Sequence, residues 1–170
     1  MIRWSLFQDF FETETMELAY VQRGAKTADF SIGQFQMKPS FVEKLETVIL
    51  QDSTLKNWYN YVLINEKTEK ECRRVRIRRM QQMAWQLRYA YVYWAVAHRV
   101  FKNRPFQTAR ERVRFFAAAY NYGFWLPEKD IAQWQQKAIF PHGKKYKFEQ
   151  VAYADLAVEF YEKYAFDFEK

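Results

Sequence analysis

Residues 83–101 read MAWQLRYAYVYWAVAHRVF, and residues 83–97 form the most apolar stretch of the chain. This stretch is too short to span a bilayer and contains Arg88, so it predicts a buried helix. The apolar positions that recur at helical spacing are Met80, Met83, Ala84, Leu87, Tyr91 and Trp94. Because the basic end of the charged run 66–79 leads directly into them, we expect one long central helix that reaches Phe101.

Further helices are expected on both sides of this stretch. One is expected from about residue 3 to residue 18 or 19, and another opens at Pro39, whose ring suits a first helical turn. Thr108 is the expected N-cap of a helix that ends at Gly123. The apolar face of a last helix is expected at Ala154, Ala157, Val158 and Tyr161. The loosely alternating residues 22–37 predict a small irregular or β-hairpin insertion.

Length and composition favour a mainly α fold in a single domain, residues 1–170. A chain of 170 residues with 49% hydrophobic and 28% charged residues suits one globular domain. Only four glycines and four prolines argue against an all-β sandwich or barrel, which needs many turns. The single cysteine, Cys72, excludes an internal disulfide framework and a cysteine-based structural zinc site, and the presence of only two histidines argues against a multi-histidine metal centre.

The net charge of +7 favours an anionic partner. The cationic residues of the run 66–79 are Lys67, Lys70, Arg73, Arg74, Arg76, Arg78 and Arg79. With glutamates interspersed, the run is interpreted as a solvated helix face. The alternative is attraction to an acidic cell-wall polymer or to nucleic acid phosphates. The start of the chain has no signal peptide pattern, and no transmembrane segment is expected.

Two short segments stand out from the helical background. Residues 31–40 read SIGQFQMKPS, and residues 117–123 read AAAYNYG. Together they resemble motifs of the lysozyme-like lytic transglycosylases, the group of soluble lytic transglycosylases and goose-type lysozymes. In that family a catalytic glutamate precedes a Gly-Leu-Met-Gln motif, and an Ala-Ala-Tyr-Asn-Ala-Gly motif follows far downstream. Glu17, which lies 19 residues before Gln36, takes the place of the glutamate.

The resemblance implies a lysozyme-like fold and cleavage of the β-1,4 bond between N-acetylmuramic acid and N-acetylglucosamine in peptidoglycan. It implies Glu17 as the acid and base, with Gln36, Tyr120 and Asn121 shaping the site. Candidate surfaces for stacking on sugar rings are Phe35, Tyr122, Phe124 and Trp125. The implied partner is a peptidoglycan glycan strand, the implied location is the periplasm or cell envelope, and no metal or organic cofactor is implied.

The chemistry of glycosidic cleavage also calls for a carboxyl group. An acid must protonate the leaving oxygen, and a glutamate does so near neutral pH when an apolar cleft raises its pKa. Glu17 is expected at the end of the first helix, and Glu12 and Glu14 are the alternatives. The family's single glutamate would yield a 1,6-anhydro sugar. Asp29 is the candidate second carboxylate, which would make the enzyme a hydrolase.

Two other functions fit the same residues. One is a non-catalytic module on the same fold that binds glycan or an envelope partner, since Leu18, Gln34 and Phe35 depart from the family motifs. The other is a basic helical nucleic-acid-binding protein that uses residues 67–79, although nucleic acid is not the expected partner. Turnover separates the enzyme from the first alternative, and salt-sensitive DNA binding would support the second.

Overall fold

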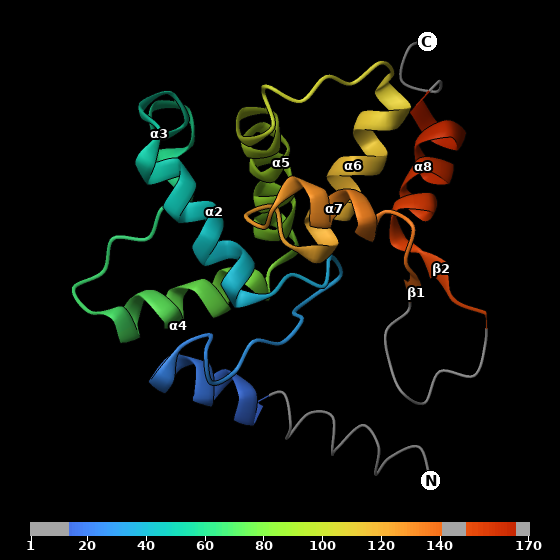
Figure 1. Ribbon diagram of the computed structural model, residues 1–170. Coiled ribbons are helices and arrows are strands. Elements are labelled where there is room, and N and C mark those ends of the chain that lie inside the picture. The colour runs from blue at the N-terminus through green and yellow to red at the C-terminus, as the bar shows by residue number, and fades with distance from the viewer. Residues whose placement is uncertain (1–13, 141–148, 166–170) are drawn as a thin grey trace, which may run out of the picture. The chain divides into compact units, whose positions relative to one another are not determined.

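The computed structural model describes residues 14–140 and 149–165 and is mainly helical, with one small two-stranded sheet. The chain divides into two compact units, Met1–Val96 and Ala97–Lys170, and each is described by itself. Figure 1 shows the helices of both units along the chain. The start of the first expected helix, with the alternative Glu12, lies outside the described residues, as does the loop at residues 141–143.

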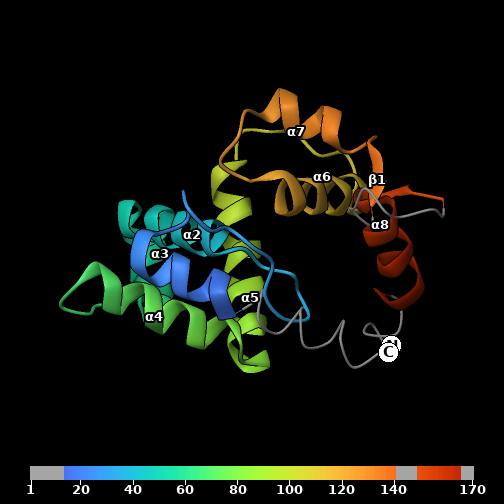
Figure 2. The same ribbon diagram turned by 90° about the horizontal axis from the view of Figure 1, so that it is seen from below.

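In the first unit, three of the helices begin at residues whose type favours a helix start. A helix at residues 14–23 is followed by α2 (Pro39–Gln51), which has proline in its first turn as expected. The Asp52 carboxylate then accepts hydrogen bonds from two backbone amides of α3 (Ser53–Tyr59), and the short 3-10 helix η1 (Asn60–Val62) follows. Thr68 and Glu71 form a capping box at the start of α4 (Glu69–Met80). Figure 2 shows α4 beside the helix of residues 14–23.

The prediction of one long central helix, continuous from the basic end of the charged run to Phe101, is wrong. The chain forms α4 and a separate α5 (Met83–Val100), with a break at Gln81 and Gln82. The two helices run in different directions in Figure 1. The carbonyl of Met80, which would accept from the next turn of an uninterrupted helix, accepts instead from the Gln86 side chain at 2.8 Å. A side-chain amide thus satisfies the end of α4.

The buried side of α5 also differs from the expected one. The positions expected to face inward are exposed, with Leu87 at 53% and Tyr91 at 65%. The buried side chains of α5 are Gln86, Tyr89, Val92, Tyr93, Val96 and Ala97. Because this helix carries apolar residues on all sides, its periodicity fits either face, and the choice depends on what packs against it. The buried side includes one polar residue, Gln86.

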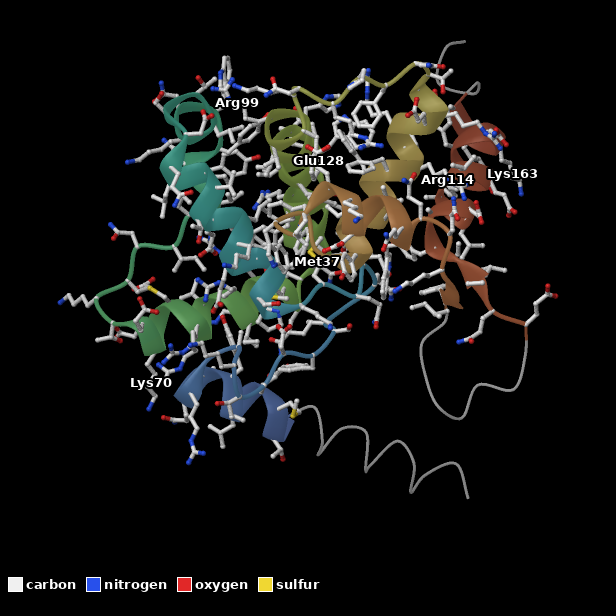
Figure 3. All side chains as sticks on the ribbon, viewed as in Figure 1. Met37, Lys70, Arg99, Arg114, Glu128 and Lys163 are labelled. Carbon is white, nitrogen blue, oxygen red and sulfur yellow. The ribbon has the colours of Figure 1, made fainter. Side chains whose placement is uncertain are left out.

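The segment between residues 24 and 38 is irregular, as the sequence predicts. Its only regular feature within the described part is an isolated antiparallel bridge between Ile32 and Met37. The four residues inside this bridge form a tight turn, in which Gly33 has φ 71° and Gln36 has φ 51°. Met37, which Figure 3 labels, is buried. The helix of residues 14–23 extends slightly into the range 22–37 expected for the insertion.

The second unit is built around α6 (Ala109–Tyr122), which packs against α8 (Tyr153–Tyr164). Thr108 caps α6 and Gly123 ends it, as predicted. Between them in sequence lie α7 (Glu128–Trp134) and the antiparallel pair of β1 (Ala138–Phe140) and β2 (Val151–Ala152). An aromatic cluster fills the core of this unit, where the Phe101 and Phe115 ring centroids lie 5.0 Å apart.

Candidate functional site

Glu17 lies at the edge of a pocket of about 600 Å³ in the first unit. The Gln81 side-chain amide donates a hydrogen bond of 2.8 Å to its carboxylate, from Nε2 to Oε1. The expected position of Glu17 at a helix end is wrong, because the helix continues to residue 23. Glu17 as a residue is half-buried, and the hydrogen bond of its carboxylate is exposed to solvent. The contact with Gln81 therefore holds the carboxylate toward the start of the α4–α5 break.

The lining of this pocket is mixed. Apolar side chains are contributed by Leu18, Val21 and Ile77. The charged side chains that line it are Glu14, Glu17, Arg74 and Arg78. Glu14, an alternative to Glu17 as the acid, is exposed in the same pocket. An apolar wall beside carboxyl groups, with cations near them, is a setting in which an anionic ligand can be held.

The turn of residues 33–36 is attached to the start of α5. The backbone N–H of Phe35 donates to Gln86 Oε1 at 3.0 Å, and Gln86 Nε2 donates to the Met80 carbonyl. A Cβ atom at residue 33 would overlap the Gln86 amide, and φ at that residue is 71°. Only glycine meets both conditions. The Gly33 of the motif is therefore needed for the close approach of a buried glutamine.

The break between α4 and α5 thus connects Glu17 and the glutamine-containing turn. Gln81 contacts Glu17, and Gln86, a few residues further along, contacts the turn. Sequence reasoning did not identify either glutamine, because each contact joins segments more than 50 residues apart in the chain. The one signal for Gln86 is a polar residue at helical spacing from Tyr89, Tyr93 and Val96.

Two other candidate residues of the first unit make local hydrogen bonds. Gln36 donates from Nε2 to the Gly33 carbonyl at 2.9 Å and is exposed. Asp29 accepts at one carboxylate oxygen from the Ser40 backbone N–H at 2.9 Å and at the other from the Ser40 hydroxyl at 2.7 Å. Asp29 thereby stabilises the start of α2. The substrate contacts of Gln36 and the role of Asp29 as a second carboxylate stay predictions.

The Tyr-Asn-Tyr residues lie at the end of α6 in the second unit. Burial, reinforced by neighbouring Tyr153, raises the pKa of the Tyr120 hydroxyl above its ordinary value, and the two rings stack at 6.4 Å. Asn121 accepts from the Trp134 indole at 2.9 Å, and the Tyr122 ring stacks on Trp134 at 4.4 Å. The motif therefore connects α6 to α7 and α8.

The candidate stacking surfaces differ in their access to solvent. Phe124 is 1% exposed and packs against the core, so its expected role as a sugar platform is wrong. Trp125 is 38% exposed, while Phe35 is half-buried in the turn of the first unit. Tyr122 is also half-buried, with one ring face on Trp134. A planar ligand therefore has access to Trp125 more readily than to Phe124.

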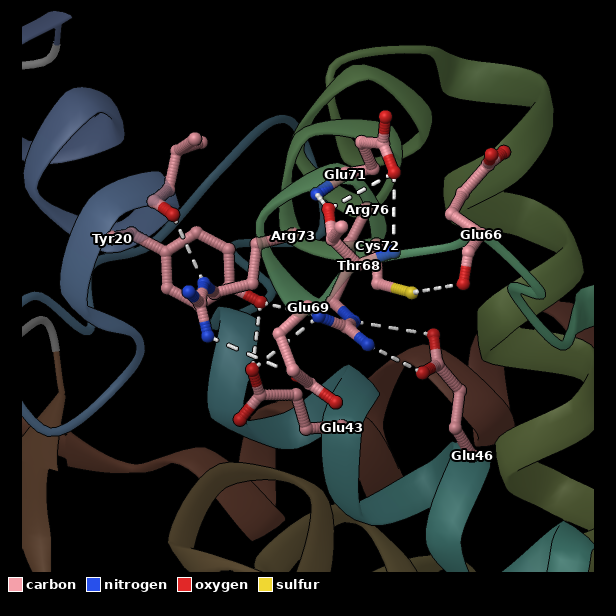
Figure 4. A network of polar contacts seen from close by, with 11 residues as sticks. Tyr20, Glu43, Glu46, Glu66, Thr68, Glu69, Glu71, Cys72, Arg73 and Arg76 are labelled. Carbon is pink, nitrogen blue, oxygen red and sulfur yellow. Dashed lines mark hydrogen bonds and ion pairs between the residues drawn. The ribbon is translucent and has the colours of Figure 1, made fainter.

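The basic run does not form one solvated face, which corrects that interpretation. Arg76 is buried and donates to Glu46 through Nη2 at 2.6 Å, and to the Tyr20 hydroxyl through Nη1 at 2.6 Å (Figure 4). Arg73 and Arg79 donate to the backbone carbonyls of Val21 and Val62. Lys70, in contrast, extends away from α4 in Figure 3.

The network around Arg76 is held by charge as well as by hydrogen bonds. Burial alone lowers the pKa of the Arg76 guanidinium, but its hydrogen bonds and attraction to Glu46 outweigh burial and raise the pKa. Burial raises the pKa of the Tyr20 hydroxyl, which donates to Glu43 at 2.8 Å. Arg76 is therefore cationic while Tyr20 is neutral, and the network connects α4, α2 and the helix of residues 14–23.

Comparisons of the chain with protein-family models, with curated proteins and with solved structures found no match. Within residues 14–140 and 149–165, no three His, Cys, Asp or Glu side chains gather as they would to hold a metal ion. None of the helices in that part of the chain combines the length and apolar character needed to cross a membrane.

Proposed function

We propose that the protein is a peptidoglycan-cleaving enzyme with a lysozyme-like fold, acting as a lytic transglycosylase with Glu17 as its acid and base. The observation that carries the proposal is the pair of hydrogen bonds, from Gln81 to Glu17 and from the Phe35 N–H to Gln86. They connect the carboxyl group and the turn of the glutamine motif to one helix junction. The substrate is located in the periplasm or cell envelope.

Glu17 supplies both proton transfers in this proposal. Its protonated carboxyl group donates a proton to the glycosidic oxygen as the bond from the muramic acid C1 breaks. The resulting carboxylate then takes the proton of the C6 hydroxyl, whose oxygen forms a bond to C1. The product is a 1,6-anhydro end, and Glu17 is left protonated again. Gln81, which hydrogen-bonds to the carboxylate, orients it for both steps.

Digestion of purified peptidoglycan tests this proposal directly. Wild-type protein, Glu17→Gln and Glu14→Gln are incubated with the polymer, and the released muropeptides are identified by mass spectrometry. We expect anhydro-muropeptides from the wild type and from Glu14→Gln, and none from Glu17→Gln. Glu14 is the matched control because it lines the same pocket and carries the same charge. Circular dichroism checks that each variant is folded.

The other outcomes are equally informative. Hydrolysed reducing ends would identify a muramidase and make Asp29 the next residue to substitute. Equal release by Glu17→Gln and wild type would remove Glu17 from the mechanism. No release by folded wild-type protein would overturn the enzymatic proposal.

A glycan-binding module without turnover is the second candidate function. The local hydrogen bonds of Gln36 and Asp29 favour it, because both side chains already stabilise the turn or the start of α2. Sedimentation with insoluble peptidoglycan distinguishes the two functions. Binding of wild-type protein without released products would support the module.

A further inference from the structure

Two arginines on the exposed side of α4 differ from the other arginines of that helix. Arg74 and Arg78 are one turn apart, are exposed, and line the same pocket as Glu17. Within the described part of the chain, neither guanidinium makes an ion pair or a hydrogen bond. Arg73, Arg76 and Arg79 each have such partners. Two cations of the pocket are thus left for a ligand.

The chemistry of these two side chains points to a carboxylate. A guanidinium presents parallel N–H donors that match the two oxygens of a carboxylate, and residues four apart on a helix lie close enough to act on one ligand. Glu17, the half-buried acid of the pocket, already accepts a hydrogen bond from the neutral amide of Gln81. An incoming anion therefore meets two cations that have no partner among the described residues, in the pocket of a carboxyl group that Gln81 contacts.

We propose that Arg74 and Arg78 bind a carboxylate of the peptide stems that peptidoglycan strands carry, at the mouth of the Glu17 pocket. This inference rests on the proposed function and specifies its substrate as the peptide-bearing glycan. The sugar backbone linked to its stems contributes little negative charge of its own, whereas the stems are acidic. The net charge of +7 adds a long-range attraction to the same polymer.

Kinetics on two substrates test the inference. The double variant R74Q/R78Q is compared with K67Q/K70Q, which removes the same charge from exposed lysines outside the pocket. On soluble peptide-bearing glycan, we expect R74Q/R78Q to raise KM about tenfold with kcat nearly unchanged, and to weaken the salt dependence of KM. K67Q/K70Q should change KM less than about twofold. On the same glycan with its stem carboxylates converted to neutral amides, both variants should match the wild type.

Each alternative result has a separate meaning. Equal KM values for the two double variants on peptide-bearing glycan, with turnover intact, would overturn the inference and leave the proposed function standing. Absence of turnover by the wild type would overturn the proposed function. Sedimentation of the wild type, R74Q/R78Q and K67Q/K70Q with insoluble peptidoglycan then tests the arginines without catalysis, and equal binding by the two double variants would overturn the inference. If R74Q/R78Q weakened binding to duplex DNA more than to peptidoglycan, the ligand would be a phosphate polymer and the inference would be wrong.

Discussion

The two sides of α4 use the same residue type in opposite ways. On one side, Arg76 is buried and its guanidinium is bound by Glu46, Glu43 and Tyr20. On the other, Arg74 and Arg78 are exposed and line the pocket of Glu17. A buried charge stabilises a fold only when its partners are present, whereas an exposed one contributes little to stability. The first side therefore holds the helices together, and the second is available for a ligand.

Among the substitutions that test this comparison, replacement of Arg76 should lower the stability of the protein most. Arg76→Met leaves Glu46 buried without its partner, so we expect the free energy of unfolding to fall by about 3–5 kcal/mol in urea titrations. Arg74→Met, on the same helix, is the control and should change it by less than about 0.5 kcal/mol. Similar losses of stability for the two variants would mean that the buried and the exposed arginines of α4 contribute equally to stability.

Gln86 connects the turn of residues 33–36 to the end of α4, and its substitution should give the next largest loss of stability. Gln86→Leu leaves the Phe35 N–H and the Met80 carbonyl without this partner, and we expect a loss of about 2–4 kcal/mol. Thermal and urea unfolding measure the loss, with exposed Gln82→Leu as the control. Because Gly33→Ala disturbs the same turn, the double variant should lose less than the two single losses added together. Additive losses would contradict a shared contact.

Alkaline pH should lower the stability that the interior of the first unit contributes, but not the small contribution of the exposed side of α4. Burial raises the pKa of the Tyr89 hydroxyl to about 12, from an ordinary value of 10.0. The folded state thus favours the neutral hydroxyl, and this contribution is complete below about pH 10 and is lost as the pH rises through about 12. The loss amounts to about 2–3 kcal/mol, at roughly 1.4 kcal/mol per pKa unit.

The difference between wild type and Tyr89→Phe isolates this contribution from that of other tyrosines. Urea unfolding at pH 9 to 12, with the tyrosinate absorbance followed in parallel, should show a steeper decline for the wild type than for Tyr89→Phe. Parallel declines would show that ionisation of Tyr89 does not limit stability in this range.

The smallest expected effect is the difference in stability between Tyr20→Phe and Tyr89→Phe, which substitute two buried tyrosines. Tyr20 donates to Glu43 and accepts from Arg76, so Tyr20→Phe should cost about 1–2 kcal/mol. Among the described residues, the buried Tyr89 hydroxyl makes no hydrogen bond of ordinary geometry, and the Arg79 guanidinium near it donates to the Val62 carbonyl, so Tyr89→Phe at neutral pH should cost less than Tyr20→Phe. Chemical unfolding at pH 7 compares the two variants. A larger loss of stability for Tyr89→Phe than for Tyr20→Phe would contradict the placement of Tyr20 in the hydrogen-bond network of Arg76.

Sequence by itself determined the mainly helical class and several helix boundaries. Pro39, Thr108 and Gly123 begin or end helices where expected, because a cap depends on the residues immediately around it. The irregular segment with its bridge between Ile32 and Met37 was also predictable from the loss of helical spacing. The motif residues of the candidate site were also identified from the sequence, as residue types at a fixed spacing.

Tertiary structure alone decided which side of α5 is buried, which arginine of α4 is internal, and why residue 33 is glycine. An apolar helix can bury either face, so its neighbours select Tyr89 and Val92 over Leu87 and Tyr91. Arg76 is buried because acids from α2 surround it, and no local pattern specifies partners 30 residues away. Adjacent residues determine the local geometry of a cap or a turn. The burial of a charged side chain and the choice of its partners depend on segments that only folding brings together.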